Sequence, residues 1–124
     1  MPHTILNVDD DVVARYLLRG VLEKAGFTVL EATTGQEGLT RAAQANLILL
    51  DAELPDIDGI EVCRRLKADP STAQIPVIQM SATFHDPEAL ANGLRGGADG
   101  ALPRQVAPET MLAAIRSLLE PPKE

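Results

Sequence analysis

Residues 4–11 read TILNVDDD, a short apolar run that ends in three consecutive aspartates. A second apolar run, Leu47–Leu50, ends in a single aspartate, Asp51. Both runs have the length and the branched side chains of buried β-strands. If the two strands are neighbours, the carboxylates at their ends converge. Such convergence is unfavourable unless a cation or a shared proton offsets the like charges.

A hard divalent cation is the natural partner for these carboxylates. Magnesium prefers oxygen ligands, typically one or two carboxylates completed by waters and phosphate oxygens. Asp9, Asp10 and Asp51 offer such a set, whereas His3 and His85 are poor candidates for a soft-metal site. The pattern therefore predicts a metal-assisted site for phosphoryl chemistry.

Strand-like and helix-like segments alternate along the whole chain. We expect strands at residues 4–8, 28–30, 47–50 and 77–80, and a short fifth strand near 101–102. We expect helices after Asp11, Thr34 and Asp86, over Ile60–Lys67, and from about Pro108. Five β-α units in succession imply a parallel sheet with right-handed crossovers and helices on both faces. The predicted fold is an open, doubly wound α/β domain.

Capping residues and apolar spacing define several of these helices. Asp11 is a favourable N-cap for the first helix, Gly26 is a favourable residue after its end, and Thr34–Glu37 has the form of a capping box. The apolar spacing of the first helix predicts one buried face, formed by Ala14, Leu17, Leu18, Val21, Leu22 and Ala25. The last helix is expected to bury Met111, Leu112, Ile115, Leu118 and Leu119.

In a sheet of strand order 2-1-3-4-5, the first and third strands flank the crevice where ligands bind, at the carboxyl ends of the strands. Asp9, Asp10 and Asp51 fall at this position. Capping alone explains one aspartate in the triplet, and we assign that role to Asp11. The excess of carboxylates favours a functional role for Asp10 and Asp51.

Composition limits the classes of function. The chain has 124 residues, 45% of them hydrophobic, which suits one globular domain. A net charge of −7 disfavours nucleic-acid or anionic-membrane binding by this segment. No run approaches the roughly eighteen apolar residues that span a bilayer, so we expect a cytoplasmic protein. Cys63 is expected to be a reduced, packed thiol.

Four motifs, in this order and spacing, resemble those of one family. They are Val8–Asp11, Leu50–Asp51 followed by Leu54–Gly59, Ser81–Ala82 and Gly97–Gly100. Together they make residues 1–120 similar to a response-regulator receiver domain of the chemotaxis-receiver type, with a flavodoxin-like fold. Residues 121–124 are then a tail or the start of a linker.

The resemblance implies a role for each site residue. Asp51 would accept a phosphoryl group from a phosphohistidine on a sensor histidine kinase or a phosphotransfer protein. Mg²⁺ would be held by Asp10, Asp51 and the backbone carbonyl of Glu53, with Asp9 acting through a bound water. Ser81 would be the switch hydroxyl that reaches a phosphoryl oxygen. Such a domain is a signalling phosphoacceptor rather than an enzyme, although it can promote its own phosphorylation and dephosphorylation.

Other polar residues near these motifs have simpler explanations. Asp56 and Asp58 lie in a turn sequence and are expected to brace the backbone. Ser81 has an alternative role as a strand-end hydroxyl that satisfies the backbone. Thr83, two residues later, is a candidate to contact the water that hydrolyses the phosphoryl group.

Two positions depart from the family pattern. Arg104 stands where the family usually has a lysine, and Lys24, Lys67 and Lys123 lie elsewhere in the sequence. Arg104 keeps the charge and can donate to phosphate, but its planar fork differs from an ammonium group. The alternative is a solvated arginine in a loop. Ala101 stands where the family usually has an aromatic switch residue, so we expect phosphorylation without the usual readout. Residues 93–100, which are rich in glycine, offer another output.

Several alternatives stay open at this point. The domain could belong to a larger protein with PAS and histidine-kinase modules, and the last helix could support a homodimer. A receiver-like interaction module independent of phosphorylation would bind its partner unchanged after Asp51→Asn. An aspartyl phosphatase with Glu53 as its acid and base would turn over phosphate esters, but so short a chain has nothing to cap a substrate.

Overall fold

The computed structural model describes residues 2–84 and 86–120. Five parallel strands form one sheet in the order β2-β1-β3-β4-β5, which confirms the predicted topology. The strands are β1 (Thr4–Val8), β2 (Thr28–Ala32), β3 (Leu47–Asp51), β4 (Val77–Ser81) and β5 (Gly100–Pro103). β1 and β3 are neighbours, with Val8 opposite Leu50, so the residues that follow them lie at one edge of the sheet.

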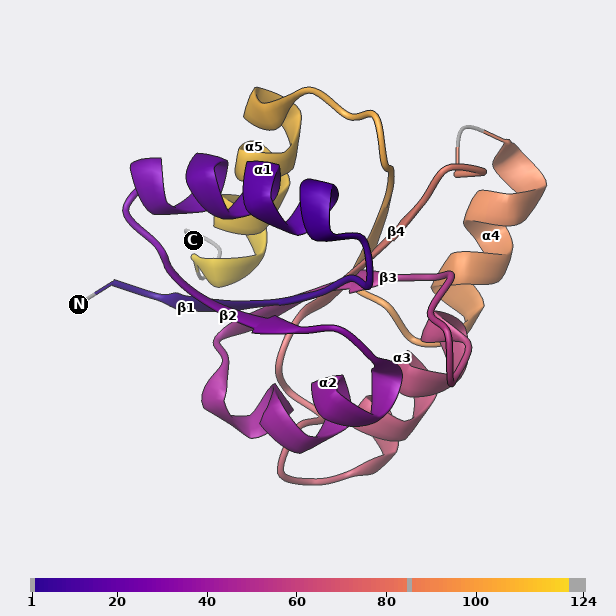
Figure 1. The fold of residues 1–124 in the computed structure, drawn as a ribbon. Helices are drawn as coiled ribbons and strands as arrows, with labels where there is room; N and C mark the ends of the chain where they lie inside the picture. The colour runs from indigo at the N-terminus through magenta and orange to yellow at the C-terminus, as the bar shows by residue number, and fades with distance from the viewer. Residues whose placement is uncertain (1, 85, 121–124) are drawn as a thin grey trace.

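Helices cover both faces of this sheet. They are α1 (Val12–Lys24), α2 (Gly35–Arg41), α3 (Gly59–Ala68), α4 (Pro87–Arg95) and α5 (Pro108–Leu119), with a short 3-10 helix, η1 (Ala42–Gln44), after α2. In Figure 1, α1 and α5 lie above the sheet, α2 and α3 lie below it, and α4 lies at its right-hand side. This arrangement is the predicted doubly wound fold.

The two faces of the sheet have separate cores. Towards α2 and α3, the core contains Leu6, Val8, Ile48, Leu50, Val62, Cys63 and Leu66. Towards α1 and α5, it contains Ile5, Leu47, Leu49, Ile78, Met111 and Ile115. All five residues of β3 are buried, because a strand at the centre of a covered parallel sheet contacts helices on both sides. Asp51, at the end of β3, is therefore held in place by a fully buried strand.

The ends of α1 follow the sequence signals, and its predicted buried face is correct except at Leu17. The Asp11 side chain accepts hydrogen bonds from the backbone N–H groups of Val13 and Ala14, and Gly26 adopts the left-handed region at φ 98°. Leu22 is fully buried and Leu18 and Val21 pack against the core, whereas Leu17 is 62% exposed. Leu17 lines an open cavity between α1 and α5, which leaves its side chain accessible.

The loop between β3 and α3 is braced by its aspartates, as predicted. Asp56 accepts hydrogen bonds from the backbone N–H groups of Gly35 and Gln36 at the start of α2, and Asp58 caps α3. Gly59 passes directly behind Asp51, where a Cβ at residue 59 would lie 2.2 Å from the Asp51 carbonyl oxygen. Only glycine permits this approach. The close packing of Gly59 against the Asp51 carbonyl thus fixes the backbone at Asp51.

A charged cluster lies at the amino ends of β4 and β5. The Lys67 ammonium donates to the carbonyl oxygens of Ala73 and Ile75 and to Asp99 Oδ2. Asp99 in turn accepts the backbone N–H of Val77 at the start of β4. This cluster ties α3 to the amino ends of the two strands.

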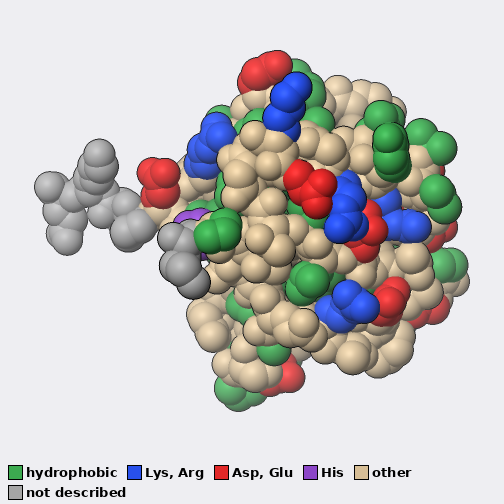
Figure 2. Space-filling view, turned by 60° about the vertical axis from the view of Figure 1, so that its left-hand side comes forward, with side chains coloured by type: hydrophobic (Ala, Val, Ile, Leu, Met, Phe, Trp, Pro, Cys, Tyr) green, Lys and Arg blue, Asp and Glu red, His purple; other side chains and the backbone are tan. Residues whose placement is uncertain are grey.

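Other expectations have mixed outcomes. Cys63 is free and buried, as predicted, and burial raises the pKa of its thiol. Residues 121–124 lie outside the described residues, so the domain boundary stays a prediction. Within residues 2–84 and 86–120, no helix is long and apolar enough to cross a membrane. On the face drawn in Figure 2, acidic and basic side chains are interspersed rather than gathered by sign.

Candidate functional site

Three carboxylates meet where β1 and β3 end. Oxygen atoms of Asp9, Asp10 and Asp51 lie within 4.8 Å of one another, which brings together the three aspartates singled out in the sequence. Asp51 and Asp9 are buried, at 5% and 7% exposure, whereas Asp10 is exposed. All three donors are hard oxygen atoms, so their chemistry fits a magnesium ion. The site therefore joins two buried carboxylates to one that reaches solvent.

Both carboxylate oxygens of Asp51 have hydrogen-bond partners. Oδ1 accepts the backbone N–H of Glu53 at 3.1 Å, and Oδ2 lies 2.8 Å from Arg104 Nη1. Burial raises the pKa of Asp51 to about 6, although the Glu53 N–H and the Arg104 guanidinium both act to lower it. Asp51 is thus a buried carboxylate whose charge is only partly compensated by the protein.

Asp9 is held in a similar way. Its Oδ1 accepts the backbone N–H of Asp11 at 2.9 Å, and its Oδ2 lies 3.0 Å from Arg104 Nη2. Its backbone is fixed as well, because its carbonyl accepts a hydrogen bond from Arg15 Nη1 at 2.8 Å. One oxygen of each buried aspartate is therefore bound to the backbone, and the other is bound to Arg104.

Arg104 lies in the site, and the alternative of a solvated loop arginine is wrong. Its backbone N–H donates to the carbonyl of Ser81, which anchors the residue beside the end of β4. Its side chain is 25% exposed, and its two terminal nitrogens bridge Asp9 and Asp51. Burial opposes the charge of the guanidinium, but Asp51 and Asp9 outweigh this effect and raise its pKa. The residue at the usual lysine position is thus the main cation of the pocket.

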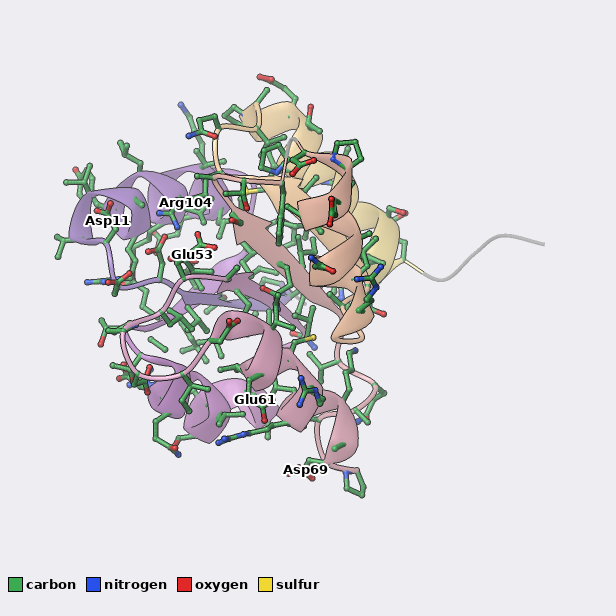
Figure 3. The ribbon with its side chains drawn as sticks, turned by 90° about the vertical axis from the view of Figure 1, so that its right-hand side faces the viewer. Asp11, Glu53, Glu61, Asp69 and Arg104 are labelled. Atoms are coloured by element: carbon green, nitrogen blue, oxygen red, sulfur yellow. The ribbon has the colours of Figure 1, made fainter. Side chains whose placement is uncertain are left out.

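Ser81 is bonded to Glu53 in this structure. The Ser81 hydroxyl donates to Glu53 Oε2 at 2.8 Å and lies 3.0 Å from Thr83 Oγ1. The backbone N–H of Thr83 also donates to Ser81 Oγ. Figure 3 shows Glu53 and Arg104 at the same end of the molecule as Asp11, while Glu61 and Asp69 lie lower, along α3 and past its end.

The contact between the Glu53 side chain and Ser81 is the feature of the site that sequence reasoning missed. The resemblance assigned only its backbone carbonyl, and the phosphatase alternative assigned its carboxylate as an acid and base. In the structure the carboxylate accepts a hydrogen bond from Ser81, 28 residues away. The parallel pairing of β3 with β4 places Asp51 opposite Met80, next to Ser81, and this register was the one signal that could have revealed the contact.

A cavity of about 250 Å³ adjoins the carboxylates between α1 and α5. Its polar residues are Asn7, Asp9, Asp51 and Arg104, and Leu17, Val106 and Pro108 contribute apolar surface. The buried Nδ2 of Asn7 has no hydrogen-bond partner among the described residues. The cavity leaves the α1 side of the pocket open and explains the exposure of Leu17.

Comparison with known proteins identifies the class. A family model described as the response regulator receiver domain matches residues 5–116. The chain therefore belongs to the response-regulator receiver family of two-component systems, which confirms the resemblance seen in the sequence.

Individual relatives agree with this assignment. The chain is 40% identical over 117 residues to the DNA-binding dual master transcriptional regulator RpaA of Synechocystis, covering 93% of this chain and 48% of RpaA. It thus spans about half the length of the curated relatives it matches. A putative response regulator from Chloroflexus aurantiacus superimposes with a TM-score of 0.90 at 31% identity, covering 96% of this chain and 98% of that one. The receiver domain of a signal transduction histidine kinase from Syntrophus aciditrophicus gives a TM-score of 0.86 at 28% identity, covering 94% and 89%.

Proposed function

We propose that this receiver domain accepts a phosphoryl group on Asp51 from the phosphohistidine of a sensor histidine kinase or a phosphotransfer protein. The observation that carries the proposal is the placement of Asp51. It ends the central strand, is buried, and lies with Asp9 and Asp10 in a group of oxygen atoms within 4.8 Å. A buried carboxylate beside further acidic ligands suits both metal binding and attack on phosphorus.

In the proposed transfer, a carboxylate oxygen of Asp51 attacks the phosphorus atom, the P–N bond of the phosphohistidine breaks, and the imidazole leaves. The backbone N–H of Glu53 orients the Asp51 carboxylate through Oδ1. Arg104, which contacts Asp51 in this structure, would donate to a phosphoryl oxygen. The Ser81 hydroxyl would leave Glu53 to contact a phosphoryl oxygen, and Thr83 would contact the hydrolytic water.

Magnesium is the cofactor that we propose for this site. Asp10, Asp51 and the backbone carbonyl of Glu53 would hold the ion, with Asp9 acting through a water. When bound, Mg²⁺ neutralises negative charge on the transferring phosphoryl group. The chain's own contribution is a set of carboxylates, two of which are already oriented by backbone N–H groups.

The wider setting of the domain is also a proposal. The limited coverage of its curated relatives is compatible with a place in a longer protein, for which a hybrid sensor kinase with PAS modules is one candidate. A homodimer, a cytoplasmic location and the lack of nucleic-acid binding by this segment stay predictions from the sequence.

Intact mass after incubation with acetyl phosphate tests the proposal. We expect the native chain to gain one phosphoryl group in a magnesium-dependent manner and Asp51→Asn to gain none. Asp69→Asn is the matched control, since Asp69 is an exposed carboxylate at the far end of α3 (Figure 3) and should leave the adduct unchanged. An adduct that persists in Asp51→Asn would contradict the assignment of Asp51.

A second candidate is an interaction module that has lost switching. Two observations favour it. Arg104 is bound to one carboxylate oxygen of each buried aspartate, and β5 has Ala101 in place of an aromatic residue. In that case no adduct would form under any condition, and partner binding would be unaffected by Asp51→Asn.

A further inference from the structure

We propose that Arg104 is a built-in counter-cation of the acidic pocket, and that Mg²⁺ must displace it from at least Asp51 in order to bind. This inference rests on the proposed function, because it concerns the same carboxylates. It adds that the residue at the usual lysine position sets the magnesium affinity of this chain by competition.

The hydrogen bonds divide the carboxylate oxygens into two classes. Oδ1 of Asp9 and Oδ1 of Asp51 accept backbone N–H groups of the loops that follow β1 and β3. These bonds belong to the folded backbone. Oδ2 of each residue is instead bound to the Arg104 side chain, at 3.0 and 2.8 Å. The two Oδ2 atoms are therefore the oxygens that can exchange one cation for another.

Arginine is well suited to this competition. Its planar fork can donate to two acceptors at once, whereas a lysine ammonium is a compact point charge. Here Nη1 and Nη2 engage different aspartates, so one side chain draws together two of the three candidate metal ligands. Because the Arg104 backbone is anchored to Ser81, the guanidinium can withdraw while its backbone stays in place.

Magnesium and the guanidinium cannot share these oxygens freely. A divalent ion bound by Asp10 and Asp51 would lie beside a unit positive charge that contacts Asp51 and Asp9, and like charges at contact distance repel. Metal binding therefore requires at least the Asp51 arm of the fork to leave. Removing the guanidinium should strengthen metal binding, because the metal-free protein then has no Arg104 contact to lose when Mg²⁺ binds.

A magnesium titration without any phosphoryl donor tests this inference. We would follow the backbone amide NMR signals of Asp10 and Ala52 in the native chain, in Arg104→Gln and in Arg64→Gln. Arg64 is the matched control, because the same charge is lost from an exposed residue on α3 whose ion-pair partner is Glu61. We expect Arg104→Gln to bind Mg²⁺ about tenfold more tightly than the native chain. Arg64→Gln should stay within about twofold of it.

Thermal unfolding gives a second readout that does not depend on phosphorylation. Without Mg²⁺, Arg104→Gln should melt at a lower temperature than the native chain, because Asp9 and Asp51 lose their shared counter-cation. Saturating Mg²⁺ should raise its melting temperature by more than it raises that of the native chain. Arg104→Lys should bind Mg²⁺ with intermediate affinity, and it replaces Arg104→Gln if the glutamine variant does not fold.

Equal or weaker magnesium affinity in the variants would overturn the competition while leaving the proposed phosphoacceptor function intact. If neither the native chain nor the variants bind Mg²⁺, the competition and the magnesium dependence of the proposed function both fall.

Discussion

Two cation–carboxylate clusters lie at opposite ends of β5, and they differ in what their cations contact. Before the strand, the Lys67 ammonium donates to two main-chain carbonyls as well as to Asp99. After the strand, the Arg104 guanidinium bridges the side chains of Asp9 and Asp51. Acceptors that belong to the backbone make Lys67 part of the fold. Acceptors that are themselves candidate metal ligands make the contacts of Arg104 exchangeable.

The largest effect that we expect in this comparison comes from Lys67→Met. The substitution removes the donor to two main-chain carbonyls and leaves Asp99 with only the Val77 N–H. Loss of one partner of a partly buried pair costs about 3 kcal/mol in the free energy of unfolding. Urea unfolding with and without Mg²⁺ would measure it. The loss should be the same in both conditions, and Lys24→Met, at the last turn of α1, should have little effect. A loss that Mg²⁺ reverses would remove the distinction between the two clusters.

The second prediction concerns the exchangeable cluster, formed by Arg104, Asp9 and Asp51, and the pH dependence of stability that it causes. Burial raises the pKa of Asp51 from 3.8 to about 6. Between these values the folded state binds the Asp51 proton more tightly than the unfolded state does, so the free energy of unfolding falls as the pH rises. A shift of about two units corresponds to an effect of roughly 2–3 kcal/mol at the buried carboxylate.

Urea unfolding of the metal-free native chain and of Asp51→Asn at pH 4, 5, 6 and 7 would isolate this contribution. Asp51→Asn cannot ionise at this position, so its stability relative to the native chain should increase across the window. Parallel pH curves for the two proteins would show that Asp51 does not have a raised pKa.

The fold could be predicted from the sequence because its signals are local. The buried strands β1 and β3 are continuous apolar runs, and Asp11 and Gly26 mark the ends of α1. The failure at Leu17 has a physical cause, since periodicity identifies the apolar stripe of a helix but not whether a neighbouring element covers all of it. Here the cavity beside Val106 and Pro108 leaves that part of the stripe uncovered.

The site could be predicted only in part, for a similar reason. The convergence of Asp9, Asp10 and Asp51 follows from strand order alone. The bridge from Arg104 to Asp9 joins residues 95 positions apart, and it depends on side-chain directions that spacing does not define. The hydrogen bond from Ser81 to Glu53 likewise depends on how the chain segments that follow β3 and β4 pack against each other. The Arg104 contacts on which the proposed competition rests are therefore visible in the structure and not in the sequence.

The smallest expected effect tests whether a signal leaves the exchangeable cluster without the missing aromatic ring of β5. Ser81 is hydrogen-bonded to Thr83, and the next residue, Phe84, packs so closely on α4 that a Cβ at Gly93 would lie 2.6 Å from its ring. If Ser81 moves towards a phosphoryl group on Asp51, the packing of Phe84 on α4 should loosen. The rate of hydrogen exchange across residues 86–106 should then rise about fivefold, which corresponds to a loss of about 1 kcal/mol in local stability.

Hydrogen exchange measured with acetyl phosphate and Mg²⁺ would detect the change, with Asp51→Asn as the control. Amides at Ile75 and Val77, beside the Lys67 cluster, should be unaffected, because the backbone contacts of Lys67 do not exchange. Unchanged exchange over residues 86–106 in a phosphorylated sample would show that the glycine-rich segment is not the output. A matching change at Ile75 and Val77 would show that the two ends of the sheet respond together.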